Sequence, residues 1–226
     1  MSREFDLLVF DWDGTLMDSV RSIVDCTRAA MIDADLEPRP ESEIREAIGM
    51  GLFDAFVGFY PGIDAARYEI VVERYRHHWL SNYKDHSDLF PGVRATLETL
   101  VESGHRLAIA TAKSRKGLER ELAKTGLVDL VRATRTVDEA PPKPDPTMLL
   151  GLMDELGVPP SRTLMIGDTT FDLDMAQNAG TAAVGVLCGS HTHAVLRGRQ
   201  PLACLERVAE LPHWLAARGA AEEIAR

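Results

Sequence analysis

Two aspartates one residue apart, Asp11 and Asp13, directly follow the apolar run of residues 7–10. Two like charges this close cost free energy unless a cation or a reaction makes use of them. Gly14 then lets the backbone turn, and Thr15 adds a hydroxyl at the turn. This combination predicts a reactive site at the end of a buried strand rather than an ordinary exposed turn.

Further polar residues occur at comparable places later in the chain. Thr111 and the pair Asp168 and Asp172 each follow an apolar run, and Lys143 lies in a proline-rich loop. Ligands of open parallel sheets bind beyond the carboxyl ends of the strands, so these side chains are expected to meet. Together they offer a nucleophile, a proton donor, ligands for a hard cation and a clamp for phosphate.

The elements that must position these residues are short strands separated by helical patterns. Five strand-like runs are found at residues 6–10, 105–110, 128–133, 163–166 and 182–186. Strands that alternate with helices predict a parallel sheet with helices on both faces. We therefore expect an α/β protein with a Rossmann-like core.

The segment of residues 18–87 interrupts this alternation, because its apolar residues follow helical spacing and it contains no convincing strand. It predicts a small α-helical cap domain inserted after the first strand. Residues 1–17 and 88–226 would then form the catalytic core, which has a normal size for one α/β domain.

Composition narrows the classes of partner. The 226 residues carry a net charge of −10, which opposes binding to nucleic acid, whereas their 45% hydrophobic content is sufficient for a sizeable core. A small anionic substrate stays possible, because a bound divalent cation reverses the local potential.

The location expected from the sequence is the cytoplasm. No apolar run approaches the ~20 residues that span a bilayer, and the charged N-terminus does not resemble a secretory signal. The three cysteines match no zinc pattern and are expected to be reduced. We expect neither a membrane nor a nucleic-acid partner, and the sequence leaves a monomer and a weak dimer equally open.

Four motifs in this order resemble the haloacid dehalogenase (HAD) superfamily, in its phosphatase branch with a small helical cap. The resemblance covers essentially the whole chain. The matching segments are Asp11-x-Asp13-Gly14-Thr15-Leu16, then Thr111, then Lys143 in Lys-Pro-Asp-Pro, and finally Gly167-Asp168-Thr169-x-x-Asp172.

The resemblance implies a phosphatase that uses Mg²⁺ as its cofactor. Asp11 would attack phosphorus and become an aspartyl phosphate, while Asp13 would act as acid and then as base. Mg²⁺ would be held by Asp11, the backbone carbonyl of Asp13, and Asp168. Asp172 would either bind the metal through water or orient Lys143. The acid at position 13 argues against carbon–halogen chemistry.

The phosphoryl oxygens would contact Thr111, Ala112 and Lys143. The family often has a polar residue where this chain has Ala112, and Lys113 is a candidate to compensate. An ordinary solvated helix start is the alternative interpretation of Lys113 and the basic residues that follow it, Arg115 and Lys116.

The cap is expected to select the substrate, a small phosphorylated metabolite. The loop Gly49-Met50-Gly51 resembles the substrate loop of phosphoglycolate phosphatases and their relatives, and 2-phosphoglycolate is the best single candidate. Arg45 and Lys113 are candidate partners for a second anionic group such as a carboxylate.

Several alternatives stay open at this point. Within the superfamily they are a sugar-phosphate phosphatase, a pyrophosphatase and a phosphomutase. Outside it, a phosphoaccepting receiver-like signalling domain also places acids after its first strand, and a non-catalytic binding protein would share the fold. His191 and His193 are better explained by a flexible loop than by a metal pair.

Overall fold

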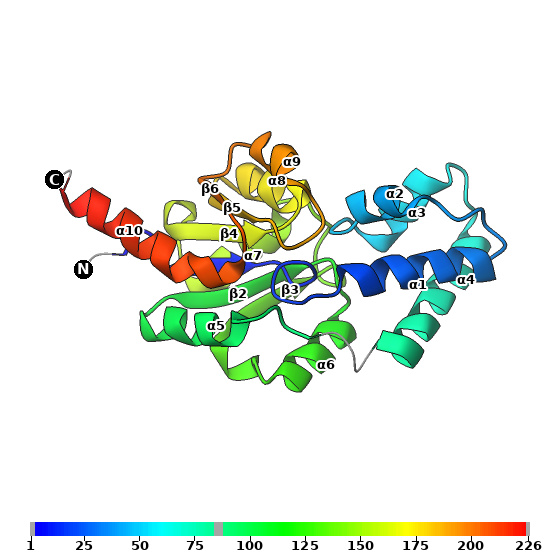
Figure 1. The fold of residues 1–226 in the computed structure, drawn as a ribbon, viewed down its shortest axis with the longest axis horizontal. Coiled ribbons are helices and arrows are strands. Elements are labelled where there is room, and N and C mark those ends of the chain that lie inside the picture. Colours follow the sequence, from blue (N-terminus) through cyan, green and yellow to red (C-terminus); the bar gives the residue numbers. More distant parts are fainter. Residues whose placement is uncertain (1–2, 84–87, 225–226) are drawn as a thin grey trace.

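The computed structural model describes residues 3–83 and 88–224, which form a six-stranded parallel sheet and the helices around it (Figure 1). The sheet has the order β3-β2-β1-β4-β5-β6. Its strands are β1 (Leu7–Phe10), β2 (Arg106–Thr111), β3 (Val131–Thr136), β4 (Thr163–Gly167), β5 (Ala182–Val186) and β6 (Ala203–Leu205). The expected α/β fold is confirmed.

Two details of the strands differ from the sequence expectation. Residues 128–130 form a 3₁₀ turn, η2 (Val128–Leu130), so β3 begins three residues later than predicted. The short strand β6 was not predicted. Both β3 and β6 pair with one neighbour only. Edge strands are less buried than central ones, so neither has the apolar run that marks β1 and β4.

Helices cover both faces of the sheet because alternate residues of each central strand point to opposite sides. Leu8 and Phe10 of β1 pack with α5 (Val93–Glu102), α6 (Arg115–Thr125) and α10 (Leu211–Ile224). Leu7 and Val9 pack with α7 (Thr147–Leu156) and α8 (Thr170–Ala179) on the other face. The short helix α9 (His193–Arg197) follows β5.

The remaining helices gather at one end of the sheet (Figure 1). They are α1 (Val20–Asp33), α2 (Glu41–Glu46), α3 (Leu52–Phe59), α4 (Ala65–His78) and the π-helical segment η1 (Trp79–Tyr83). Helices α1 to α4 share a hydrophobic cluster that is separate from the two sheet-face clusters. A cap of residues 18–87 remains our proposal for the domain organisation, and its return boundary at residue 87 lies outside the described residues.

Among residues 3–83 and 88–224, no helix combines the length and the apolar character required to cross a lipid bilayer.

Candidate active site

Four segments that are distant in sequence meet beyond the carboxyl end of β1. Carboxylate oxygens of Asp11, Asp168 and Asp172 lie within 4.8 Å of one another, and all three side chains are buried. The Asp11 amide donates to the Ile166 carbonyl at 2.9 Å, which continues the pairing of β1 with β4. Adjacent parallel strands thus bring the first and fourth motifs together.

Lys143 joins the acids of these two motifs. Its buried Nζ lies 2.7 Å from Oδ1 of Asp11 and 2.6 Å from Oδ1 of Asp172. The second oxygen of Asp172 accepts hydrogen bonds from the Thr169 hydroxyl at 2.7 Å and the Thr169 amide at 3.0 Å, forming a capping box at the start of α8. Both oxygens of Asp172 therefore have protein partners, which favours the role of orienting Lys143.

The Asp168 carboxylate is held by one side chain and one backbone amide. Its Oδ1 accepts from the Thr15 hydroxyl at 2.8 Å, and its Oδ2 accepts from the Ser190 amide at 2.7 Å. A Cβ on Gly14 or Gly189 would lie 2.3 or 2.0 Å from this Oδ2, so only glycine allows the close approach. The backbone of Gly14 also has φ +81, a conformation that favours glycine.

The charges of this cluster do not balance. Three buried carboxylates face a single buried ammonium, which leaves two negative charges uncompensated when all groups are ionised. Burial raises the pKa of Asp11 well above its usual range, and the charges of Asp172 and Asp168 add to this effect. Burial and the Asp172 charge raise the pKa of Asp168 to about 7. Oxygen ligands with excess negative charge suit a hard divalent cation.

Asp13 lies at the same edge and is held through both oxygens. Its Oδ1 accepts from the Ser19 hydroxyl at 2.7 Å, and its Oδ2 lies 3.2 Å from Nζ of Lys113. Ser19 is the N-cap residue of α1, yet its side chain makes no capping hydrogen bond and is used for Asp13 instead. The contact of Ser19 with Asp13 was not predicted from the sequence, where its only signal is a hydroxyl six residues after Asp13.

The second motif, at Thr111, lies next to Lys113 and therefore close to Asp13. Thr111 is the last residue of β2 and is buried, and its Oγ1 accepts a hydrogen bond from the Lys113 amide at 3.1 Å. Ala112 follows it and is half-buried. The Lys113 ammonium lies 3.2 Å from Glu121 and 4.8 Å from the ring centre of Trp79. Lys113 is therefore part of a charged cluster, and the alternative of a solvated helix start does not apply to it.

Glu121 is a residue that sequence reasoning missed. It is buried on the same face of α6 as Leu118 and Leu122, and its Oε2 accepts from the Trp12 indole at 2.5 Å. A carboxylate on the apolar stripe of a helix is the signal that marks it, because Glu is seldom buried without a partner.

The predicted substrate loop rests on the core at the rim of the site. A Cβ on Gly49 would lie 2.9 Å from Oγ1 of Thr169, and one on Gly51 would lie 3.2 Å from Cβ of Pro142. Met50 between them is half-buried. Arg45 on α2 donates to the Gly189 carbonyl at 3.3 Å. The loop and Arg45 therefore contact residues that adjoin the acidic cluster.

His191 lies in the loop between β5 and α9, and its side chain is held there by contacts on both ring nitrogens. It is buried, and its Nδ1 accepts from the Thr170 amide at 3.0 Å, so the proton is on Nε2. That nitrogen donates to the Glu46 carbonyl of α2 at 3.1 Å. His193 is exposed. His191 therefore connects α2 to the first turn of α8 and forms no metal pair with His193.

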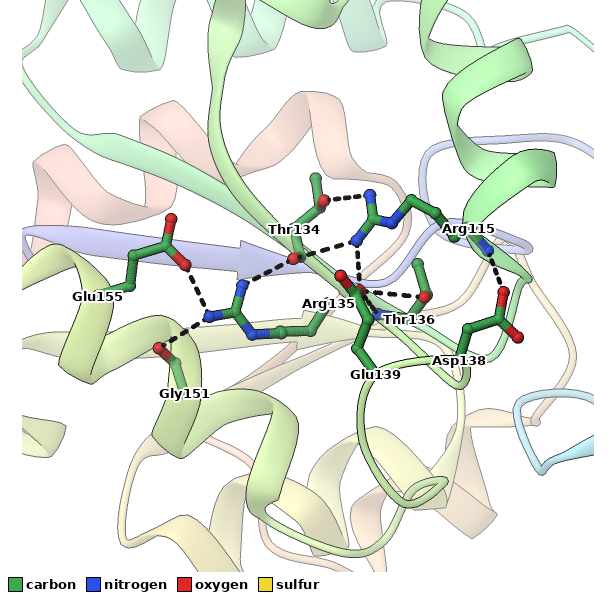
Figure 2. A network of polar contacts seen from close by, with 8 residues as sticks. All are labelled: Arg115, Thr134, Arg135, Thr136, Asp138, Glu139, Gly151 and Glu155. Atoms are coloured by element: carbon green, nitrogen blue, oxygen red, sulfur yellow. Dashed lines mark hydrogen bonds and ion pairs between the residues drawn. The ribbon is translucent and has the colours of Figure 1, made fainter.

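Arg115 binds the edge strand β3 and the loop that follows it (Figure 2). Its guanidinium donates to the Thr134 hydroxyl at 2.7 Å and also contacts Glu139, while its amide donates to Asp138 at 2.7 Å. Glu139 in turn accepts from the Thr136 amide at 3.0 Å. This network fixes the loop that leads from β3 to Lys143 and leaves Arg115 unavailable for a substrate.

The three cysteines form no disulfide in the structure. Burial raises the pKa of Cys26 and of Cys188 to about 12, and it also raises the pKa of Cys204. None of these thiols is an activated nucleophile, because the thiolate is the reactive form.

Known proteins with similar sequences are phosphatases. The chain is 35% identical over 211 residues to the probable phosphatase IndB of Dickeya dadantii, covering 91% of each chain. It is 31% identical over 201 residues to a phosphoglycolate phosphatase of Haemophilus influenzae, covering 84% of this chain and 88% of that one. It is also 29% identical over 210 residues to the pyrophosphatase PpaX of Bacillus velezensis, covering 91% and 94%.

Solved structures agree with these sequence matches. A predicted phosphoglycolate phosphatase from Haemophilus somnus superposes with a TM-score of 0.84 at 25% identity, over 94% of this chain and 99% of that one. The family described as haloacid dehalogenase-like hydrolase matches residues 8–186, the span from β1 to the end of β5. The chain therefore belongs to the haloacid dehalogenase-like hydrolases, and within them it is a phosphatase.

Proposed function

We propose that this phosphatase hydrolyses a small phosphate monoester with Mg²⁺ and an aspartyl-phosphate intermediate on Asp11, and that its substrate is 2-phosphoglycolate. The observation that carries the proposal is the buried cluster of Asp11, Asp168 and Asp172 around Lys143, at the edge where the family motifs converge.

The reaction proceeds in two displacements. A carboxylate oxygen of Asp11 attacks phosphorus, the bond from phosphorus to the ester oxygen breaks, and Asp13 gives that oxygen a proton. Asp13 then takes a proton from a water that attacks the aspartyl phosphate. The second displacement releases inorganic phosphate and restores the Asp11 carboxylate.

Mg²⁺ would be held by Asp11, Asp168 and the backbone carbonyl of Asp13. When bound, it supplies positive charge to carboxylate and phosphoryl oxygens that would otherwise repel one another. The donor set fits this ion, because it consists of hard oxygen ligands with excess negative charge.

The phosphoryl oxygens would be held by Thr111, Ala112 and Lys143. In this assignment Thr111 offers its hydroxyl, Ala112 offers its backbone amide, and Lys143 offers a charge oriented by Asp172. Fixed positive charge and fixed donors are what phosphoryl transfer needs, since positioning and electrostatic stabilisation supply most of its catalysis.

The choice of 2-phosphoglycolate rests on the cap and on the relatives. The Gly49-Met50-Gly51 loop lies against Thr169 and Pro142 at the rim of the site, and a similar protein is a phosphoglycolate phosphatase. We assign the substrate carboxylate to Arg45, because the Lys113 ammonium already faces Asp13 and Glu121. Pyrophosphate is the second candidate, since another relative is a pyrophosphatase.

A stable phosphoaccepting receiver is disfavoured because the chain belongs to a family of hydrolases. The cytoplasmic location stays a prediction, and both a monomer and a weak dimer stay open.

The substrate is tested by release of inorganic phosphate from 2-phosphoglycolate, pyrophosphate and a panel of sugar phosphates. We expect the highest kcat/KM with 2-phosphoglycolate, loss of activity with a chelator, and recovery when Mg²⁺ is added. A higher kcat/KM for pyrophosphate would replace the substrate assignment, and activity that survives chelation would contradict the Mg²⁺ requirement.

Mg²⁺ should stabilise the protein more at higher pH. Without metal, the raised pKa of Asp168 means that the folded chain binds more protons than the unfolded chain between pH 3.8 and about 7. Stability of the metal-free protein therefore falls as pH rises through that window. Mg²⁺ needs the ionised carboxylate and competes with this proton.

We expect the Mg²⁺ affinity to weaken by up to about tenfold for each pH unit below about 7. The gain in Tm on adding Mg²⁺, measured by circular dichroism against a chelated control, should accordingly grow from about pH 5.5 to about pH 8. A gain in Tm that is independent of pH would contradict metal binding at Asp168.

A further inference from the structure

Glu121 has no role in the reaction described so far, yet it is one of the few buried carboxylates of the core. It comes from α6 and not from a motif loop. Its two oxygens contact different residues: Oε2 accepts from the Trp12 indole, and Oε1 lies 3.2 Å from Nζ of Lys113. Burying a carboxylate costs free energy unless its charge is paired and hydrogen-bonded, so the role of these two contacts needs an explanation.

The Trp12 contact fixes Glu121 relative to the first motif. Trp12 lies between Asp11 and Asp13 in sequence and is fully buried. Its indole nitrogen has only a hydrogen to donate, so Glu121 is its acceptor. A change in the position of α6 would therefore be transmitted to the backbone that carries both aspartates.

The Lys113 contact extends this connection to Asp13. The ammonium lies 3.2 Å from Glu121 and 3.2 Å from Oδ2 of Asp13, so it bridges the two carboxylates. Burial alone would lower the pKa of Lys113, but the charges of Asp13 and Glu121 outweigh it and raise that pKa. Lys113 therefore stays charged and keeps both carboxylates within reach.

The helical segment η1 contributes a third contact to Lys113 through its first residue, Trp79. The Trp79 ring lies 4.8 Å from the Lys113 ammonium and stacks on Tyr75 at 6.3 Å. A cation over an aromatic face is attracted to it, and a desolvated cation more strongly. Lys113 is thus confined by two carboxylates from the core and one ring from the helical insertion.

We propose that Glu121 is a positioning residue which, through Lys113, holds the Asp13 carboxyl where it transfers a proton to the leaving oxygen. This inference rests on the proposed function, because it assigns Glu121 a role in the step that Asp13 performs. Glu121 itself contacts neither the substrate nor the reacting atoms.

The leaving group distinguishes this role from a merely structural one. An alkoxide leaves slowly unless an acid protonates it, whereas p-nitrophenolate leaves readily without a proton. A misplaced Asp13 therefore slows the cleavage of alkyl phosphates and hardly affects p-nitrophenyl phosphate. General damage to the fold slows both.

The test compares kcat/KM of Glu121→Gln for p-nitrophenyl phosphate and for the alkyl phosphate that the wild-type protein cleaves fastest, both with Mg²⁺. We expect the alkyl value to fall about 10- to 100-fold, within the range of general acid catalysis, and the p-nitrophenyl value to fall less than about threefold. Glu119→Gln is the matched control, since Glu119 is exposed on the same helix and should change neither value.

A second variant keeps the test decisive if Glu121→Gln folds poorly. Lys113→Met should show the same selective loss, and adding Glu121→Gln to it should cost less than about twofold more, because the contact that Glu121 uses is already gone. Equal losses for both esters, or full additivity in the double variant, would overturn the inference. Wild-type activity that is absent on both esters would instead refute the proposed function.

Discussion

Asp11→Asn should lower kcat/KM for every phosphate ester by at least about 10³-fold, a loss typical of variants that lack the catalytic nucleophile. A carboxamide oxygen is a poor nucleophile and does not form the acyl phosphate that the two displacements require. The effect should be the same for alkyl and for p-nitrophenyl esters, in contrast to the selective loss expected at position 121.

The loss at position 11 should occur without unfolding. Asp11 and Asn have nearly the same shape, and an amide oxygen still accepts from Lys143, whose ammonium lies 2.7 Å from Oδ1 of Asp11. Removing one of three clustered negative charges also lowers their mutual repulsion. The Tm of the chelated variant should therefore equal or exceed that of the wild type.

Asp129→Asn is the matched control, because Asp129 is exposed and the same change of charge there should leave kcat/KM unchanged. The measurement is phosphate release under saturating Mg²⁺, with Asp11→Ala beside it to exclude recovery through deamidation. Retention of more than about a tenth of the wild-type rate in both variants would rule out Asp11 as the nucleophile, given the size of such losses.

The assembly of the main cluster could be predicted from sequence because it depends on one topological rule. Asp11 and Asp168 follow β1 and β4, which turn out to be hydrogen-bonded neighbours in a parallel sheet. Residues at the carboxyl ends of neighbouring parallel strands lie at the same edge, whatever the loops between them do. The rule needs only the strands and the order of the motifs.

The contacts that support this cluster could not be predicted in the same way. Ser190 and His191 bind atoms of residues that are distant in sequence, and neither has a spacing that distinguishes it. Gly189 illustrates the difficulty: a Cβ at this position would lie 2.0 Å from the Asp168 carboxylate, and this proximity arises only in the folded chain.

The edges of the sheet were also beyond sequence patterning. Strand β6 has three residues, and β3 carries Thr134, Arg135 and Thr136, whose polar side chains bind the neighbouring helices and loop (Figure 2). Hydrophobic periodicity reports burial, and edge strands are only half-buried. The central strands, buried on both faces, were therefore located well and the edges poorly.

Lys143→Met should have the largest combined effect on activity and stability. The Lys143 side chain is buried, and its ammonium is the only positive charge within hydrogen-bond distance of Asp11 and Asp172 in the described part of the chain. Methionine keeps most of the volume and removes the charge. We expect kcat/KM to fall by at least about 10²- to 10³-fold, as when a fixed donor to a transition-state oxygen is lost.

The stability of the metal-free protein should fall at the same time. Removing one partner of a buried ion pair leaves its carboxylates uncompensated, which costs about 3–5 kcal/mol. The cost should shrink at low pH, because protonation neutralises the acids, and it should also shrink when Mg²⁺ is present. Urea unfolding of the chelated variant, with exposed Lys116→Met as the matched control, measures it.

A second substitution distinguishes the effect of the lost positive charge on stability from the effect of the changed packing. Asp172→Asn in the Lys143→Met background removes one of the carboxylates that have lost their positive partner, so it should restore part of the lost free energy of unfolding. In the wild-type background the same substitution should be destabilising. It should not restore activity, since the positive charge that faces the phosphoryl group is still absent. If the two substitutions instead destabilise additively, Asp172 does not act through Lys143, and its position beside Asp11 and Asp168 would have to be explained by the metal.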